Sequence, residues 1–279
     1  MSWVGYAVDM VQVGVGRIFA AAGVLPLLGT VVWAGAFMQP SGRGQVIITA
    51  RFEASDTYLD SRGRRQPVRD YRKFELQAWT EYGLTGNVTL IAAPSAMRIA
   101  TSVQANPVRR AAEVRDTYGK VEAGARFRVW SLVGGIMSLQ ATAALSAKVE
   151  QANQAGIRYD RNEIDLRVLY GRNFNWRSWR GFVDIQTAYR MRAGALDEWC
   201  SDITLGVQAS QRWMLLVQNF NVVALPGRTM ARRRSHKLQM SLVYRFAQNW
   251  SAQAGMFTTF AARRARRDKG YIAALWRTF

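Results

Sequence analysis

Cysteine and histidine are almost missing from this 279-residue chain, and proline is scarce. The single cysteine, Cys200, excludes an intramolecular disulfide and a cysteine-based metal site. The single histidine, His236, leaves metal binding and histidine-based catalysis with few groups to use. We therefore expect the chain to carry no cofactor and no metal ion.

Long apolar runs are missing as well beyond residue 36. No later stretch approaches the ~18 consecutive apolar residues of a membrane-spanning helix, although 49% of the chain is hydrophobic. This excludes a multi-helix membrane protein. Acidic residues are few, since 38 Lys and Arg oppose 19 Asp and Glu and give a net charge of +19. Such an excess favours a polyanionic partner, which is nucleic acid, anionic lipid or lipopolysaccharide.

The first 36 residues differ in kind from the rest. They end in an apolar run over 18–36, in which Ala34 and Ala36 fit the small-residue pattern at which a secretory signal peptide is cut. We expect residues 1–36 to be a signal peptide and 37–279 to be a single domain. A membrane anchor is the alternative, but the glycines and the proline of the run disfavour a stable spanning helix.

Beyond residue 40, apolar and polar residues alternate with the period of two that indicates β-strands. Leu238, Met240 and Leu242, for example, alternate with Gln239 and Ser241. The pattern predicts about twelve strands, over 45–54, 73–82, 88–97, 121–130, 138–145, 164–170, 183–190, 202–209, 214–223, 238–246, 252–260 and 271–279.

The predicted connections alternate between long and short. Long ones cover 55–70, 103–118, 148–160, 191–199, 225–235 and 262–269, and short ones cover 83–87, 131–135, 173–180, 211–213 and 247–250. Outer-membrane barrels have long loops outside the cell and short turns in the periplasm. We therefore predict an all-β fold, a transmembrane antiparallel up-and-down β-barrel in the outer membrane of a Gram-negative bacterium.

Aromatic residues gather at both ends of the predicted strands, as Trp and Tyr do at lipid interfaces. Beside the short turns lie Tyr82, Trp130, Trp176, Trp179, Trp213, Trp250 and Phe279. Beside the long loops lie Tyr58, Tyr71, Tyr118, Tyr159, Trp199 and Tyr271. A soluble β-sandwich, the alternative fold, needs neither belt.

The chain ends on a strand that closes with Phe279. In an outer-membrane barrel the last strand must pair with the first, here 46–52, so that no edge is left unpaired. The terminal strand is also the segment that the barrel assembly machinery reads, and we expect that machinery to be a partner.

The polar face of the strands is charged and is expected to line the barrel lumen. The candidate lumen and selectivity residues are Arg51, Glu53, Glu75, Glu81, Glu122, Arg126, Arg128, Asp165, Arg167, Asp184, Arg190, Asp202 and Arg245. Two interpretations stay open. Either these charges set the selectivity of a narrow solute path, or they pair across the strands and seal the lumen. The sequence contains no lumen plug domain.

Most of the surplus positive charge falls in the predicted outer loops. These loops hold Arg64, Arg65, Arg109, Arg110, Arg232, Arg233, Arg234, Arg263, Arg264, Arg266 and Arg267. Arginine binds phosphate bidentately, so we expect contact with lipopolysaccharide phosphates. Recruitment of an anionic solute is the alternative role. Nucleic acid is not expected, because the arginines are scattered over several loops of an exported chain.

A lipid-modifying enzyme at the outer rim is a further alternative, since such sites combine a histidine with a serine or a carboxylate. His236 and Ser235 lie near the outer end of a predicted strand. Consecutive strand residues point to opposite faces, so these two cannot form a nucleophile–base pair. No catalytic residue is therefore predicted.

Several segments resemble a known family. They are EYGLTGNVTL over 81–90, GARFRVW over 124–130, DITLG over 202–206 and ALWRTF over 274–279. These are similar to turn and strand-edge sequences of uncharacterised proteobacterial outer-membrane β-barrel proteins, loosely similar to porin-like transporters of the phenol-degradation-associated type. The resemblance implies that fold and location. With the charged lumen, it favours a passive channel for small solutes, anionic or aromatic-acid ones among them. The alternative is a structural or accessory barrel with a sealed lumen.

Overall fold

The described residues form strands and their connections. The structure is a computed structural model that describes residues 35–103, 112–132, 134–150, 161–177, 179–226 and 232–279. Its strands are β1 Gly44–Leu59, β2 Arg65–Thr85, β3 Val88–Val103, β4 Ala112–Leu132, β5 Gly135–Glu150, β6 Glu163–Trp176, β7 Trp179–Arg192, β8 Glu198–Gln208, β9 Trp213–Ala224, β10 Arg233–Ala247, β11 Trp250–Arg263, β12 Ala265–Arg266 and β13 Lys269–Thr278. Across these ranges, no helix is long and apolar enough to span a membrane.

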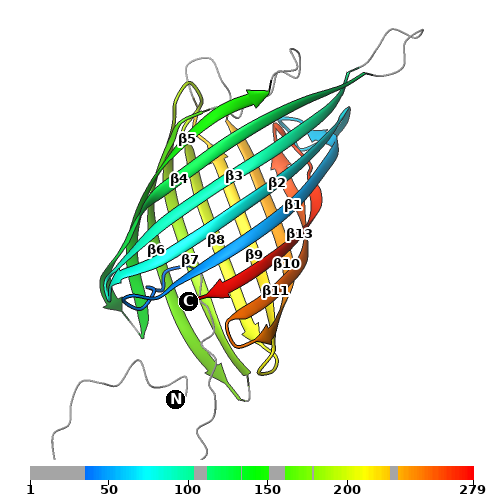
Figure 1. Cartoon of the computed structure of the whole chain (residues 1–279). Coiled ribbons are helices and arrows are strands. Elements are labelled where there is room, and N and C mark those ends of the chain that lie inside the picture. Colours follow the sequence, from blue (N-terminus) through cyan, green and yellow to red (C-terminus); the bar gives the residue numbers. More distant parts are fainter. Residues whose placement is uncertain (1–34, 104–111, 133, 151–160, 178, 227–231) are drawn as a thin grey trace, which may run out of the picture. The chain divides into compact units, whose positions relative to one another are not determined.

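The strands form a closed antiparallel barrel in which neighbours in the chain are neighbours in the sheet (Figure 1). β1 pairs with β2 on one side and with β13 and the two-residue β12 on the other, so β12 and β13 together fill the twelfth place. Phe279 and Gly44 exchange backbone hydrogen bonds of 2.9 and 3.0 Å beyond the end of β13. The predicted closure by the terminal strand is confirmed, and among the described residues β1 to β11 and β13 each pair with a strand on both sides.

The strands are longer than the alternation predicts, with 21 residues in β2 and in β4 but only 11 in β8 and 12 in β9. The loop positions predicted for five arginines are therefore corrected to strand ends, and these are Arg65, Arg233, Arg234, Arg263 and Arg266. The strands that hold these arginines continue beyond the lipid. There both faces of a strand meet water, so apolar and polar residues no longer alternate. Connections do hold Arg64, Arg232, Arg264 and Arg267, whereas Arg109 and Arg110 lie outside the described residues.

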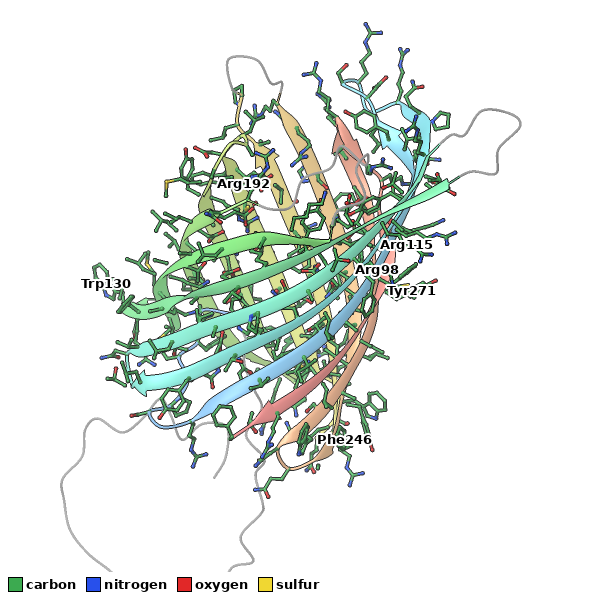
Figure 2. All side chains as sticks on the ribbon, turned by 45° about the horizontal axis from the view of Figure 1, so that its top comes forward. Arg98, Arg115, Trp130, Arg192, Phe246 and Tyr271 are labelled. Carbon is green, nitrogen blue, oxygen red and sulfur yellow. The ribbon has the colours of Figure 1, made fainter. Side chains whose placement is uncertain are left out.

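Side chains on the outer face of the barrel are apolar and aromatic. Trp130, Phe246 and Tyr271 are exposed there and stand away from the wall (Figure 2). The predicted belt near the short turns is confirmed, since Trp130 is 65% exposed and most other members are similarly open. Such a surface is the one that a barrel presents to lipid.

Two tyrosines of the predicted outer belt point inward instead. Tyr71 of β2 and Tyr118 of β4 are buried in the lumen with Met97 and Ile99 of β3. Tyr71 has the same parity as Lys73, which also faces the lumen, so the ladder turns both away from lipid. Tyr159 lies outside the described residues.

A short segment over 35–43, here called the N-terminal segment, precedes β1 and enters the lumen at the end that carries the short turns. Ala36, Phe37 and Gln39 are buried there. The sequence contains no plug domain, but this extended segment occupies the same place with few residues. Of the predicted signal peptide, only Gly35 and Ala36 are among the described residues, and its removal stays a prediction.

Candidate functional site

The turn end of the lumen contains a buried ion pair. Arg126 of β4 and Glu81 of β2 are 2% and 0% exposed, and Arg126 Nη2 lies 2.8 Å from Glu81 Oε1. Arg126 Nε donates to Gln140 Oε1 at 3.0 Å, and Nη1 donates to the Phe37 carbonyl at 3.0 Å. Glu81 Oε2 accepts from the side-chain amide of Gln39 at 2.8 Å. The pair therefore ties the N-terminal segment to β2, β4 and β5.

The same segment is held by β5 and β7. The backbone N–H of Ala36 donates to Asp184 Oδ2 at 2.5 Å, and its carbonyl accepts from Ser138 Oγ at 2.7 Å. The ring of Phe37 packs edge-on against Phe182, with centroids 6.3 Å apart. Polar and aromatic contacts thus fix the segment inside the barrel wall.

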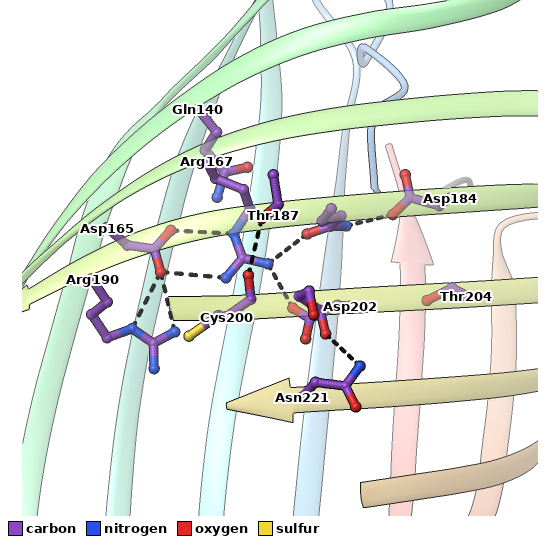
Figure 3. Close-up of polar contacts among 12 residues, drawn as sticks. Gln140, Asp165, Arg167, Asp184, Thr187, Arg190, Cys200, Asp202, Thr204 and Asn221 are labelled. Carbon is purple, nitrogen blue, oxygen red and sulfur yellow. Dashed lines mark hydrogen bonds and ion pairs between the residues drawn. The ribbon is translucent and has the colours of Figure 1, made fainter. Parts of the chain in front are cut away.

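A second network runs across β6, β7 and β8 (Figure 3). Arg167 lies 2.6 Å from Asp202 and 3.2 Å from Asp165, and it donates to Gln186 Oε1 at 2.7 Å. Arg190 lies 3.1 Å from the other oxygen of Asp165. Each guanidinium therefore bridges neighbouring strands, which stabilises their register inside the lumen.

Three arginines converge on one carboxylate at the loop end of this network. Glu198 of β8 is buried, and its oxygens lie 3.5 Å from Arg190 and 3.0 Å from Arg233, with Arg192 also in direct contact. Arg190 also pairs with Asp165, so this cluster and the network before it together hold four guanidinium groups and three carboxylates, a positive surplus of one. The side chain of Arg233 is about half exposed and can meet solutes at the loop end.

Another cluster surrounds Glu53 of β1. Its carboxylate oxygens lie 3.5 Å from Lys73 and 3.4 Å from Lys237. Lys73 also lies 3.3 Å from Glu75, and Lys237 lies 2.8 Å from Asp268. Here two lysines face three carboxylates, which leaves these five groups with one negative charge in excess.

The structure brings most of the predicted lumen residues together in these networks. Of the others, Arg51 lies over the ring of Phe257 with its Cζ 5.9 Å from the centroid, Glu122 and Arg245 are half-buried, and Arg128 is exposed at the turn end. Their part in selectivity stays a prediction. Sequence reasoning missed Lys73, Arg192, Glu198, Arg233 and Asp268 as members of charged clusters. Most of these fall in segments that the alternation assigns to loops.

His236 belongs to a row of polar side chains on the outer, lipid-facing wall. Its Nδ1 lies 2.7 Å from Asn221 Oδ1, and Asn221 Nδ2 donates to Asn219 Oδ1 at 2.5 Å and to the Ser201 carbonyl at 3.0 Å. Ser235 is the preceding residue in β10 and therefore points to the opposite face. The partner of the histidine is an amide. Over the described ranges, no group of three or more His, Cys, Asp or Glu side chains could hold a metal ion.

The loop between β7 and β8 carries a perturbed carboxylate. Asp197 Oδ2 accepts from the hydroxyl of Tyr189 at 2.7 Å, and Oδ1 accepts from the backbone N–H of Arg192 at 3.1 Å. These hydrogen bonds, first the one from Tyr189, hold the pKa of Asp197 below its ordinary value because they favour the charged form. The loop end beside the arginine cluster thus carries a carboxylate that stays charged.

No known family model and no curated protein sequence matches the chain. Solved structures do resemble its fold. An outer membrane channel from Pseudomonas putida F1 superposes with a TM-score of 0.67 at 13% identity, over 90% of this chain and 100% of that one. The translocator domain of the autotransporter NalP from Neisseria meningitidis gives 0.51 at 13% identity, over 86% and 90%. The β domain of the Bordetella autotransporter BrkA gives 0.54 at 10% identity, over 86% and 100%.

These similarities agree with the closed twelve-strand ladder and with the apolar outer wall. At such low identity they concern the fold alone. The chain is an outer-membrane β-barrel, loosely similar to porin-like barrels.

Proposed function

We propose that the protein is a passive outer-membrane channel for small anionic solutes, aromatic acids among them. Charged clusters lie on the inner face of the barrel, beside apolar side chains such as Phe257 and Trp276. The similarity in fold to a protein described as an outer membrane channel also supports a channel function.

The observation that carries the anion preference is the convergence of Arg190, Arg192 and Arg233 on Glu198. Counted with Arg167, Asp165 and Asp202, to which Arg190 connects them, these groups have a net charge of about +1 at neutral pH. In a narrow, partly desolvated passage, such a charge attracts anions and repels cations. Guanidinium groups also pair bidentately with carboxylates, which suits an organic acid.

Planar-bilayer recordings test the proposal. In a KCl gradient, the reversal potential of the wild-type protein should lie toward the equilibrium potential of chloride. Benzoate should reduce the chloride current by binding to the arginine cluster around Glu198. The triple variant Arg190→Gln, Arg192→Gln, Arg233→Gln should lose most of the anion preference. Arg64→Gln, in the exposed connection between β1 and β2, is the matched control and should behave as wild type.

Each outcome separates one part of the proposal. No ion current under any condition would refute a channel. A current that is cation-selective, or that the triple variant leaves unchanged, would refute the anion path while keeping the channel.

A sealed structural barrel is the second candidate, and the N-terminal segment favours it. Ala36, Phe37 and Gln39 fill the turn end of the lumen and are bonded to three strands. A solute path must run beside these residues or require them to move. If the wild-type protein passes no ion current in planar bilayers but a variant without residues 35–39 does, the sealed form is the resting state.

We further infer that outward-facing arginines at the loop end contact lipopolysaccharide phosphates. Arg72, Arg98 and Arg115 are exposed on neighbouring strands of the longest part of the wall (Figure 2 labels Arg98 and Arg115). Arg98 pairs in the ladder with Phe74, a lipid-facing residue, so this patch lies beside the wall surface that faces lipid. Replacing all three with Gln should lower the lipopolysaccharide that copurifies, measured by lipid A mass spectrometry. An unchanged amount would exclude this contact.

A further inference from the structure

Gly35 and Ala36 are built into the barrel. Ala36 is 0% exposed, with its N–H and its carbonyl both bonded to lumen side chains. Gly35 has a φ of +113°, and a Cβ at this position would stand 2.2 Å from Asp184 Oδ2 and 2.4 Å from Asp184 Cγ. Only glycine fits a positive φ and so close an approach without strain. A cut after Ala36, which the small-residue pattern indicates, would remove both residues and leave their places in the lumen empty.

Asp184 is a buried carboxylate whose hydrogen-bond donors are neutral. It is 1% exposed and accepts from the backbone N–H of Ala36 and from Gln186 Nε2 at 2.5 Å. Within the described ranges, the structure gives it no Lys or Arg nitrogen closer than 4.0 Å. Arg126 and Arg167 act on it only at longer range, so this buried charge has no directly paired cation and its burial carries a desolvation cost. A cation beside Asp184 would remove that cost.

We propose that the mature chain begins at Gly35 and that its new α-ammonium group is the counter-ion of Asp184. The sequence Val32-Trp33-Ala34 keeps the required small residue at the last position of the leader. In the cleavage, water adds across the amide between Ala34 and Gly35. The carbonyl carbon of Ala34 takes the hydroxyl, and the nitrogen of Gly35 takes hydrogen and then a proton from solvent. This nitrogen is bonded to a Cα that packs directly against the Asp184 carboxylate.

This processing would complete the turn end of the lumen. The ammonium of Gly35 pairs with Asp184, while Ala36 keeps its bonds to Asp184 and Ser138. The N-terminal segment is then anchored by a charge that exists only after the leader is removed. The inference does not depend on the solute, since it concerns only how the chain is cut and how its new end is held.

The test uses the whole precursor, expressed in a Gram-negative host and extracted from the outer membrane. N-terminal sequencing and intact mass should give a chain that starts Gly-Ala-Phe-Met. A chain that starts at Phe37, or one that keeps its leader, would overturn the proposal.

The ion pair is tested by the pH dependence of α-amine acylation, followed by mass spectrometry of the N-terminal peptide. A free α-amino group has a pKa of about 7.7–8.0, and pairing with Asp184 should move the midpoint of the wild-type profile above about 9. Asp184→Asn should return the midpoint to about 8. If Asp184→Asn only made the α-amine more exposed, the acylation rate at high pH would change, but the midpoint of the pH profile would not.

Asp202→Asn is the matched control, because it removes another lumen carboxylate that pairs with Arg167. It should leave the midpoint where the wild type has it. Equal midpoints in wild type and Asp184→Asn would refute the pair. If Asp184→Asn does not fold, a wild-type midpoint near about 8 refutes it as well.

Discussion

Arg126→Ala should be among the most destabilising single changes in the barrel. It leaves the fully buried carboxylate of Glu81 without its cation and removes the donor to the Phe37 carbonyl. Removing one partner of a buried ion pair costs about 3–5 kcal/mol. Water can enter the lumen once the N-terminal segment loosens, so we expect the lower end, about 3 kcal/mol. Such a loss lowers the folding equilibrium constant on the order of 100-fold, because each 1.4 kcal/mol is about tenfold.

The assay is urea unfolding of the barrel in lipid vesicles, followed by Trp fluorescence and by gel mobility without heating. The free energy is taken by linear extrapolation. Arg64→Ala, in an exposed connection, should stay within about 0.5 kcal/mol of wild type. Adding Glu81→Gln to Arg126→Ala should recover part of the loss, because the unpaired buried charge is then gone. An Arg126→Ala barrel as stable as Arg64→Ala would refute the argument that this pair is buried and coupled.

Three further perturbations follow from the structure. Deleting Phe279 removes the backbone bonds to Gly44, so less heat-modifiable barrel should reach the outer membrane, and a normal yield would contradict its role in closure. Tyr189→Phe should raise the pKa of Asp197 toward its ordinary value, read by NMR of the carboxyl carbon. The stabilising contribution of that contact is present above the unfolded pKa and is lost as pH falls through the lowered folded pKa. His236→Ala should leave any lipid hydrolysis unchanged, and a loss of hydrolysis would revive the enzyme alternative.

The fold could be predicted because its signal is local. Residues such as Leu238, Met240 and Leu242 repeat with the period of the strand, and Phe279 ends the chain on a strand. The lipid imposes this alternation only over its own thickness. Beyond that thickness, Arg233 and Glu198 fall in segments without alternation, so the sequence pattern does not predict that they belong to strands.

The pairing inside the lumen could be predicted only in part. The alternation places both Glu81 and Arg126 on the inward face, but β3 lies between their strands. Whether they meet depends on the stagger of the whole barrel, which no short window of sequence contains. The N-terminal segment was missed for a related reason. Gly35, Ala36 and Phe37 show no periodic pattern, and their place is set by hydrogen bonds to residues 89 to 148 positions away.

The lipid-facing polar row makes the hydrophobic height of the barrel uneven around its circumference. In β9, Trp213 marks the inner interface, and Asn219 lies six residues further along. At about 3.3 Å per residue and a tilt of about 40°, the apolar band there is only about 15 Å tall. Barrels of this class ordinarily present about 25 Å. The bilayer beside β8, β9 and β10 must therefore become thinner, or the barrel must tilt toward that side. In either case the protein sets the local membrane thickness.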